Sequence, residues 1–159
     1  MRRVVITGMA PICALGSNHE ELFQNLCDKK RVIERIDKNT PARKKIRASW
    51  YVPYPNLEDD LFREKLAQVK TRGSTSAYAA TKASLLALQD AGLEQADEDA
   101  VVFIGNDSFS MGEFTNEILR FEQEQKMNIM VVPMTMQSSI DSWVTIALGT
   151  HGMSSVLNM

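Results

Sequence analysis

The sequence predicts an α/β protein built on a largely parallel sheet that is flanked by helices. Short apolar runs, which are typical of buried strands, alternate with longer amphipathic segments, which are typical of helices. The strand-like runs are residues 3–7, 100–104 and 154–157. The chain has 159 residues, which is enough for one ordinary domain with a hydrophobic core.

The first strand and the first helix are predicted from adjacent signals near the N-terminus. Residues Arg3–Thr7 predict a short buried strand, because β-branched residues run up to Gly8. Ser17 and Glu20 form a capping-box pattern, with Ser17 at the N-cap of a helix and Glu20 at its third position. We expect one face of this helix to be buried, and its apolar residues are Leu22, Phe23, Leu26 and Cys27.

A strongly basic segment follows between residues 29 and 47. Nine lysines and arginines are opposed there only by Glu34 and Asp37. Two interpretations stay open, a solvated loop and a docking surface for an acidic partner. Residues 50–55 are aromatic and proline-rich, which predicts an extended or turn segment.

The remaining elements complete the alternation of helices and strands. A short amphipathic helix is predicted over residues 57–69, and Ser74 or Thr75 caps a longer helix that runs to about Ala91. Glycines follow the predicted helix ends near residues 91 and 148, where a left-handed residue commonly stops a helix. The predicted elements of the second half are a strand over 100–104, helices over 111–124 and 133–148, and a strand over 154–157.

Composition excludes several classes of protein. The net charge of −2 provides no strong field, and no stretch has the length of a membrane span, so we expect neither nucleic acid nor a membrane as partner. With two cysteines and two histidines, the sequence predicts no disulfide framework, no metal site and no cofactor. We therefore expect a reducing, cytoplasmic compartment. Nine methionines are compatible with apolar ligand surfaces and with adaptable core packing.

Four segments carry a combined pattern that none of them carries alone. They are Arg3–Met9 with Leu15-Gly16 and the helix at Glu20–Phe23; Ala79–Leu93; Val101–Gly105; and Pro133–Gly152 with Ser154–Val156. In this order and spacing the segments resemble the β-ketoacyl synthase family. Members of that family begin with such a strand, continue into a glycine loop and a helix, and later place a strand before a glycine-rich loop.

The resemblance implies a thiolase-like layered α/β fold, of which residues 1–159 form the N-terminal portion of a ketosynthase domain, without its C-terminal half. It implies a β-ketoacyl-(acyl-carrier-protein) synthase, which performs acyl transfer and decarboxylative Claisen condensation of an acyl group with malonyl-carrier protein in fatty-acid or polyketide synthesis. In the family, the last strand leads into a helix that begins with the nucleophilic Cys. We therefore expect that Cys just after Met159, and no catalytic residue within the chain.

The alternative is a non-catalytic subunit, similar to a chain length factor, that shares the fold and lacks the nucleophile. A third hypothesis is a stand-alone α/β binding module. The family's partners imply an acyl carrier protein, and a homodimer or a heterodimer with another ketosynthase subunit. Cys13, Cys27 and His151 do not match the family's catalytic positions, and no recognisable nucleophile–base pair is present in the sequence.

The resemblance also places candidate site residues within the chain. Phe109, Met134 and Met136 lie where the family borders its acyl pocket and subunit interface, although ordinary core packing explains each of them equally well. Lys70 and Arg72 lie where the family docks its acidic carrier protein.

The sequence departs from the family pattern at several points. The glycine-rich loop has become Gly105–Ser110, and Met153 replaces a common Pro. Asp141 and Ser142 stand where small apolar residues are usual, and an Asp in that place must find a partner or face solvent. These departures fit a divergent member of the family or a non-catalytic partner subunit.

Overall fold

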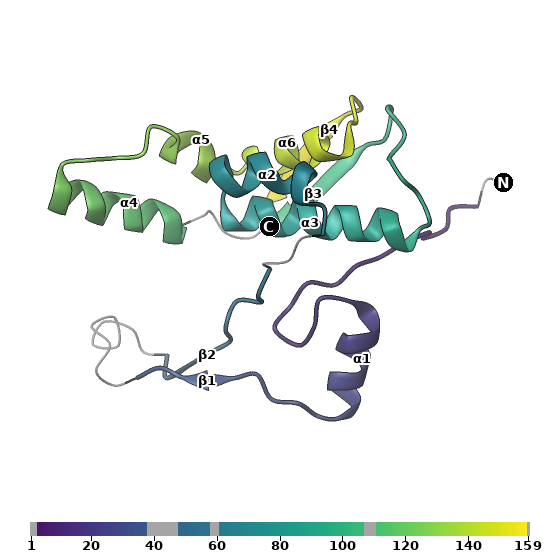
Figure 1. The fold of residues 1–159 in the computed structure, drawn as a ribbon, viewed down its shortest axis with the longest axis horizontal. Coiled ribbons are helices and arrows are strands. Elements are labelled where there is room, and N and C mark those ends of the chain that lie inside the picture. Colours follow the sequence, from purple (N-terminus) through teal and green to yellow (C-terminus); the bar gives the residue numbers. More distant parts are fainter. Residues whose placement is uncertain (1–2, 38–47, 58–60, 107–110, 159) are drawn as a thin grey trace. The chain divides into compact units, whose positions relative to one another are not determined.

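The computed structural model describes residues 3–37, 48–57, 61–106 and 111–158 (Figure 1). The chain divides into two compact units, of which the larger comprises residues 1–9 and 59–159 and the smaller residues 10–58. The elements of the larger unit are α2 (Arg63–Arg72), α3 (Thr75–Asp90), β3 (Val102–Asn106), α4 (Met111–Glu124), α5 (Val131–Thr135), α6 (Ser139–Leu148) and β4 (Ser154–Asn158). Helices therefore alternate with strands, as the sequence predicts.

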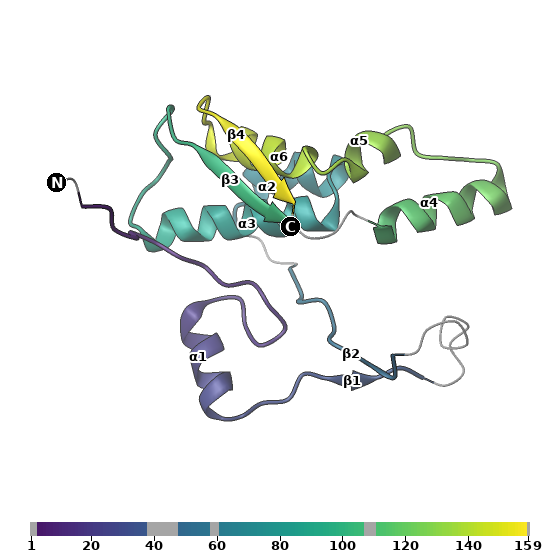
Figure 2. The same ribbon diagram turned by 180° about the vertical axis from the view of Figure 1, so that it is seen from behind.

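Strands β3 and β4 form a parallel pair, and α4, α5 and α6 lie between them in sequence (Figure 2). The register pairs Val102 with Ser154 and continues to Asn106 opposite Asn158. Val102 is buried, while Phe103 next to it is 58% exposed, which is the period-two alternation of a strand covered on one face. The predicted α/β class with parallel strands is confirmed, and β3 runs on through Gly105 instead of ending at it.

The long helix α3 begins and ends where the sequence predicts. The Ser74 hydroxyl oxygen accepts a hydrogen bond from the Ala77 N–H at 3.1 Å, which caps the helix, and Gly92 follows it with a φ of +70°. Buried Ala77, Thr81 and Leu85 recur at four-residue spacing and form the inner face. The Thr81 hydroxyl donates to the Ala77 carbonyl at 2.7 Å, so its polar group is satisfied within the helix.

The core of the larger unit forms where α2, α3 and α6 meet. Its fully buried members are Leu66, Val69, Ala77, Leu85 and Ile140, with Ile104 of β3 and Trp143 of α6 packed against them. The helices cover the face of the sheet to which Val102 and Ile104 belong, since α6 contacts both strands. Burial of these side chains is the main stabilising contribution here, at roughly 1.5–3 kcal/mol for each leucine, valine and isoleucine and less for Ala77.

The predicted strand over Arg3–Thr7 is wrong in this structure. Residues 3–9 belong to no helix or strand, and Val4, Val5 and Ile6 are 96%, 72% and 84% exposed. The β-branched composition gives strand propensity, but a strand also needs a partner edge, and none of the described residues pairs with this segment. Residues 3–9 contact the end of α3 at their C-terminal end, where Gly8 approaches Ala87 and Ala91 and the Met9 N–H donates to Asp90 at 3.0 Å.

The smaller unit holds α1 (His19–Cys27) and an antiparallel pair of two-residue strands, β1 (Glu34–Arg35) and β2 (Trp50–Tyr51). The predicted capping box is displaced by one residue, because Asn18 is the N-cap and accepts from the Glu21 N–H at 2.8 Å, while Glu21 accepts from the Ser17 N–H. No residue of α1 is buried, so the expectation that Cys27 lies on a buried face is wrong. Residues 38–47 of the basic segment lie outside the described residues.

None of the helices in the described part of the chain combines the length and apolar character that a membrane crossing requires.

Candidate functional site

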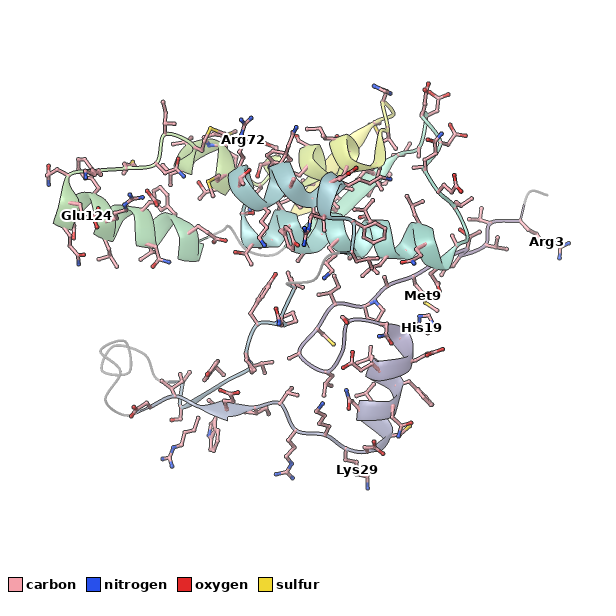
Figure 3. The ribbon with its side chains drawn as sticks, viewed as in Figure 1. Arg3, Met9, His19, Lys29, Arg72 and Glu124 are labelled. Carbon is pink, nitrogen blue, oxygen red and sulfur yellow. The ribbon has the colours of Figure 1, made fainter. Side chains whose placement is uncertain are left out.

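The two cations predicted to dock a carrier protein both lie in the last turn of α2. Lys70 and Arg72 are exposed there, where the negative end of the helix dipole favours positive charge. Figure 3 shows the Arg72 side chain on the outside of the larger unit. Both cations are exposed and follow directly on the core residue Val69, and an exposed pair of cations is compatible with binding an acidic surface.

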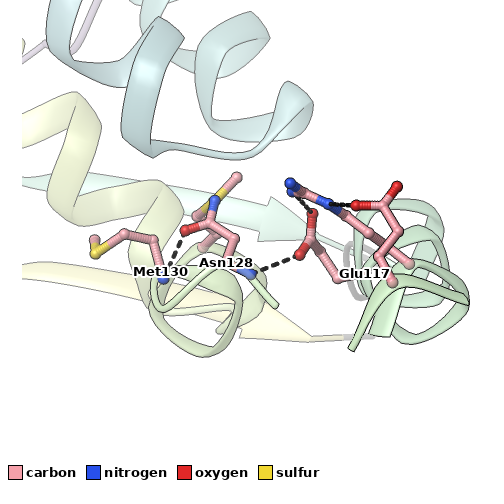
Figure 4. A network of polar contacts seen from close by, with 6 residues as sticks. Glu117, Asn128 and Met130 are labelled. Carbon is pink, nitrogen blue, oxygen red and sulfur yellow. Dashed lines mark hydrogen bonds and ion pairs between the residues drawn. The ribbon is translucent and has the colours of Figure 1, made fainter. Parts of the chain in front are cut away.

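A polar network fixes the segment that leads from α4 to the candidate acyl-pocket residues (Figure 4). The Glu117 carboxylate accepts a hydrogen bond from the Asn128 N–H at 2.7 Å, and the Asn128 side-chain oxygen accepts from the Met130 N–H at 2.9 Å. The Asn128 amide also lies 3.7 Å from the Met134 sulfur. Arg120, one turn further along α4, pairs with Glu117 at 3.6 Å and so holds the carboxylate that receives the Asn128 N–H.

The helix predicted from Pro133 to Leu148 is broken in two. Met136, between α5 and α6, has an extended ψ of 135°, so the chain turns there before α6 begins. The Ser139 hydroxyl donates to the Met136 carbonyl at 2.7 Å, which satisfies an acceptor that the break has released. The break leaves Met134 half-buried and Met136 half-exposed, while Phe109 lies outside the described residues. The structure therefore places Met134 in α5 and Met136 directly after that helix, and it does not test their contact with an acyl chain.

A shallow, open depression of about 520 Å³ lies between the α5–α6 connector, residues 136–138, and β4. Its lining residues are Met136, Gln137, Ser138, Asp141, Ser154, Ser155 and Val156. Asp141 is only 7% exposed, and its Oδ1 has no hydrogen-bond partner among the described residues. The sequence singled out Asp141 as a polar residue at an apolar position, but it gave no signal for the serines of β4, because their proximity depends on the β3–β4 pairing.

A second carboxylate, which the sequence analysis missed, lies at the start of α3. Glu113 of α4 accepts a hydrogen bond from the Thr75 N–H at 2.9 Å. Partial burial raises the pKa of Glu113, but the hydrogen bonds from Thr75 outweigh it, so the pKa is lowered overall. This contact joins α4 to the positive end of α3, and its role is structural.

The cysteines and histidines do not form a reactive group in the described part of the chain. Cys13 is half-buried in the smaller unit, Cys27 is exposed, and the His151 backbone N–H donates to the Glu98 carbonyl at 2.7 Å. Among the described residues no three His, Cys, Asp or Glu side chains are grouped so that they could hold a metal ion.

The model of the "Beta-ketoacyl synthase, N-terminal domain" matches residues 1–158. A comparison with curated protein sequences finds no match.

Solved ketosynthase structures have the same fold. The structure titled "The ishigamide ketosynthase/chain length factor" is similar with a TM-score of 0.79 at 16% identity, over 99% of this chain and 40% of that chain. A β-ketoacyl synthase from Burkholderia phymatum STM815 has a TM-score of 0.71 at 21% identity, over 99% and 39%. A type II polyketide synthase acyl carrier protein in complex with its ketosynthase bound to the hexaketide (AntDE:AntF) gives 0.63 at 20% identity, over 99% and 37%. The chain thus spans about two fifths of the length of these structures.

Proposed function

The chain belongs to the β-ketoacyl synthase family, as its N-terminal domain, and on this premise we propose that the protein takes part in condensing acyl groups with malonyl-carrier protein. The match of the family model to residues 1–158 is the observation that carries the proposal. The parallel β3–β4 pair with α6 packed on one face agrees with it.

In the proposed reaction, a cysteine thiolate attacks the thioester of an acyl-carrier protein, and the carrier's thiol leaves. Malonyl-carrier protein then loses CO₂, and the resulting enolate carbon attacks the acyl-enzyme carbonyl. A carbon–carbon bond forms and the cysteine thiolate is released. Residues 1–159 contain no recognised catalytic residue for this reaction. We place the nucleophilic cysteine just after Met159, at the start of a helix that would follow strand β4. The reaction requires no cofactor.

Residues 1–159 would then be one portion of a larger thiolase-like ketosynthase domain. Two observations support this part of the proposal. The chain spans about two fifths of the solved ketosynthases, and Phe103 and Leu157 leave the second face of the β3–β4 pair apolar and more than half exposed. Parallel strands are normally covered on both faces, so further structure on this face is expected.

The second candidate function is a non-catalytic subunit similar to a chain length factor. It is favoured by Asp141, whose buried carboxylate stands at a position where the family usually has a small apolar residue. The ishigamide structure pairs a ketosynthase with a chain length factor, according to its title. In this role the protein would form a heterodimer with a catalytic ketosynthase, whereas the enzyme would form a homodimer or a heterodimer.

Within either role we assign substrate contacts to the residues that the family places there. Met134 and Met136, with Phe109, would border the acyl chain, and Lys70 and Arg72 would bind an acyl carrier protein. A cytoplasmic location and a pathway in fatty-acid or polyketide synthesis belong to the same proposal. The exposure of Met136 and of Arg72 supports their availability to ligands.

The test is a condensation assay on the full protein that the gene encodes. The protein is incubated with acyl-carrier protein and malonyl-carrier protein labelled at the free carboxyl carbon, alone and together with a catalytic ketosynthase subunit. Release of labelled CO₂ with formation of β-ketoacyl-carrier protein by the protein alone supports the enzyme. Activity only in the mixture, with product length depending on this protein, supports the partner subunit. No effect in either assay contradicts the proposed function.

A further inference from the structure

Strands β1 and β2 of the smaller unit lie side by side in Figure 1 and form a ribbon whose two faces differ in chemistry. The register pairs Glu34 with Tyr51 and Arg35 with Trp50, and side chains paired in this way lie on the same face. The Tyr51 hydroxyl donates to the Glu34 carboxylate at 2.6 Å, so the acidic side chain of that face has a partner within the ribbon. On the opposite face the Arg35 guanidinium lies over the Trp50 ring, 5.8 Å from its centroid.

Exposed apolar side chains flank the pair of Arg35 and Trp50. Trp50 is 58% exposed, and Ile33 and Val52, each two positions along the chain from one member of the pair, are 59% and 56% exposed. The period-two spacing of an extended chain assigns Ile33 and Val52 to the same face as the pair. We call these four residues the Arg35–Trp50 face. Tryptophan and arginine are enriched in protein interfaces, and grouped exposed apolar side chains mark interaction surfaces.

The charge of the surrounding sequence selects an acidic partner for this face. Residues 29–47 contain nine lysines and arginines and two acidic residues, whereas the whole chain has a net charge of −2. The cations Lys29–Arg31, which precede β1, are exposed. The two acidic residues are Asp37 and Glu34, and Glu34 lies on the other face of the ribbon. A basic segment of this kind attracts carboxylates and repels a cationic partner.

The mixed character of the face favours a polypeptide over a nucleic acid. A single-stranded nucleic acid binds through its phosphates and by stacking its bases on aromatic rings. The aliphatic side chains of Ile33 and Val52 provide no stacking surface, but they can cover the apolar side chains of a polypeptide. Carboxylates beside those apolar side chains would then pair with Arg35 and with the cations that precede β1.

We propose that the Arg35–Trp50 face of the β1–β2 ribbon is a docking surface for an acidic polypeptide segment that carries apolar side chains. Trp50 supplies the central apolar contact, and Arg35 supplies a charge-assisted pair to a carboxylate of the partner. The Trp50 ring holds the guanidinium in place, which reduces the side-chain entropy that binding costs. The inference depends on the smaller unit alone and is independent of the proposed condensing function.

The test measures binding of a fluorescein-labelled peptide, made of glutamates with two central leucines, to the full protein by fluorescence anisotropy. We expect saturable binding that weakens as the ionic strength rises. Trp50→Ala is expected to lower the affinity by about tenfold or more, and Arg35→Gln by about fivefold. The same peptide with lysines in place of the glutamates is expected not to bind.

Two variants serve as controls. Tyr51→Phe changes the opposite face, and Lys126→Gln removes an exposed cation of the larger unit, so both are expected to keep the affinity within about twofold of wild type. Circular dichroism checks that every variant folds, and Arg35→Gln keeps the test decisive if Trp50→Ala does not fold.

Three results would overturn the proposal. The first is the absence of peptide binding, which is expected if the rest of the full protein covers this face. The second is an affinity that neither Trp50→Ala nor Arg35→Gln lowers, or that Lys126→Gln lowers as much as Arg35→Gln does. The third is equally tight binding of a single-stranded oligonucleotide of the same net charge, which would assign the face to nucleic acid.

Discussion

Replacing Gly152 by alanine would disturb the turn that sets β4 beside β3. The His151 and Gly152 N–H groups both donate to the Glu98 carbonyl, at 2.7 and 3.1 Å, so the two turns that precede β3 and β4 are bonded together. A Cβ added at Gly152 would lie 2.4 Å from the Ala100 carbonyl oxygen and 2.6 Å from that of Asp99. Ordinary contacts begin near 3.4 Å, so the backbone of one turn must move.

The expected cost follows from these distances. Both clashing atoms are backbone oxygens that cannot rotate away, and overpacking of this kind costs about 1–3 kcal/mol. Weakening of the two hydrogen bonds to Glu98 adds roughly 1 kcal/mol. Restriction of the unfolded chain by alanine offsets roughly 0.4–1 kcal/mol of this. We therefore expect Gly152→Ala to lower the free energy of unfolding by about 2–3 kcal/mol.

Urea unfolding followed by far-UV circular dichroism measures this change. Gly105→Ala is the matched control, because Gly105 lies in β3 of the same strand pair and a Cβ there meets nothing within 4 Å. Its free energy of unfolding is expected to stay within about 0.5 kcal/mol of the wild-type value. If the two variants prove equally stable, the close approach of the two turns does not hold β4 in register, and the reasoning fails.

Three other predictions concern single contacts. Glu113→Gln is expected to lower the free energy of unfolding by about 1 kcal/mol, a value reduced for the solvent exposure of Glu113. Because the pKa of Glu113 is lowered in the folded protein, the difference from wild type is full above about pH 4.5 and disappears as the pH falls through the folded pKa. Urea unfolding at several pH values measures this difference. The Tyr51 hydroxyl donates a hydrogen bond to the Glu34 carboxylate at 2.6 Å, and this bond, together with the negative charge of Glu34, raises the pKa of Tyr51 above 10.0. Ultraviolet titration should find the raised pKa in the wild type and a lower pKa in Glu34→Gln. Identical titration curves for the two proteins contradict the contact. Reversal of charge at Lys70 and Arg72 in the full protein is expected to raise KM for the carrier protein and to weaken its salt dependence. Kinetics at two ionic strengths measure both effects, and unchanged values contradict the docking role.

The sequence predicted best where the deciding interactions are local. The Ser74 cap, the Gly92 stop and the bounds of α4 follow from residues a few positions apart, and the structure confirms them. The Arg3–Thr7 strand required a partner distant in sequence, which composition does not encode. The break at Met136 was missed because residues 133–148 all permit a helix, and only side-chain bonds such as that of Ser139 reveal where it divides.

In the candidate site, too, the sequence predicts the local features and misses those that depend on residues distant in sequence. Asp141 is visible in the sequence as a charge on an apolar helix, but the rule that an acid in the first turn caps its own helix predicts an engaged carboxylate. The carbonyls of Met136 and Gln137, turned toward α6 by the break, take the N–H groups that the carboxylate would otherwise accept from. The same break places the connector across from Ser154 and Ser155 of β4 and so forms one side of the depression. The unpaired state of the buried Asp141 Oδ1 among the described residues is thus a consequence of the missed break, and in a continuous helix the first-turn N–H groups would be free to donate to it.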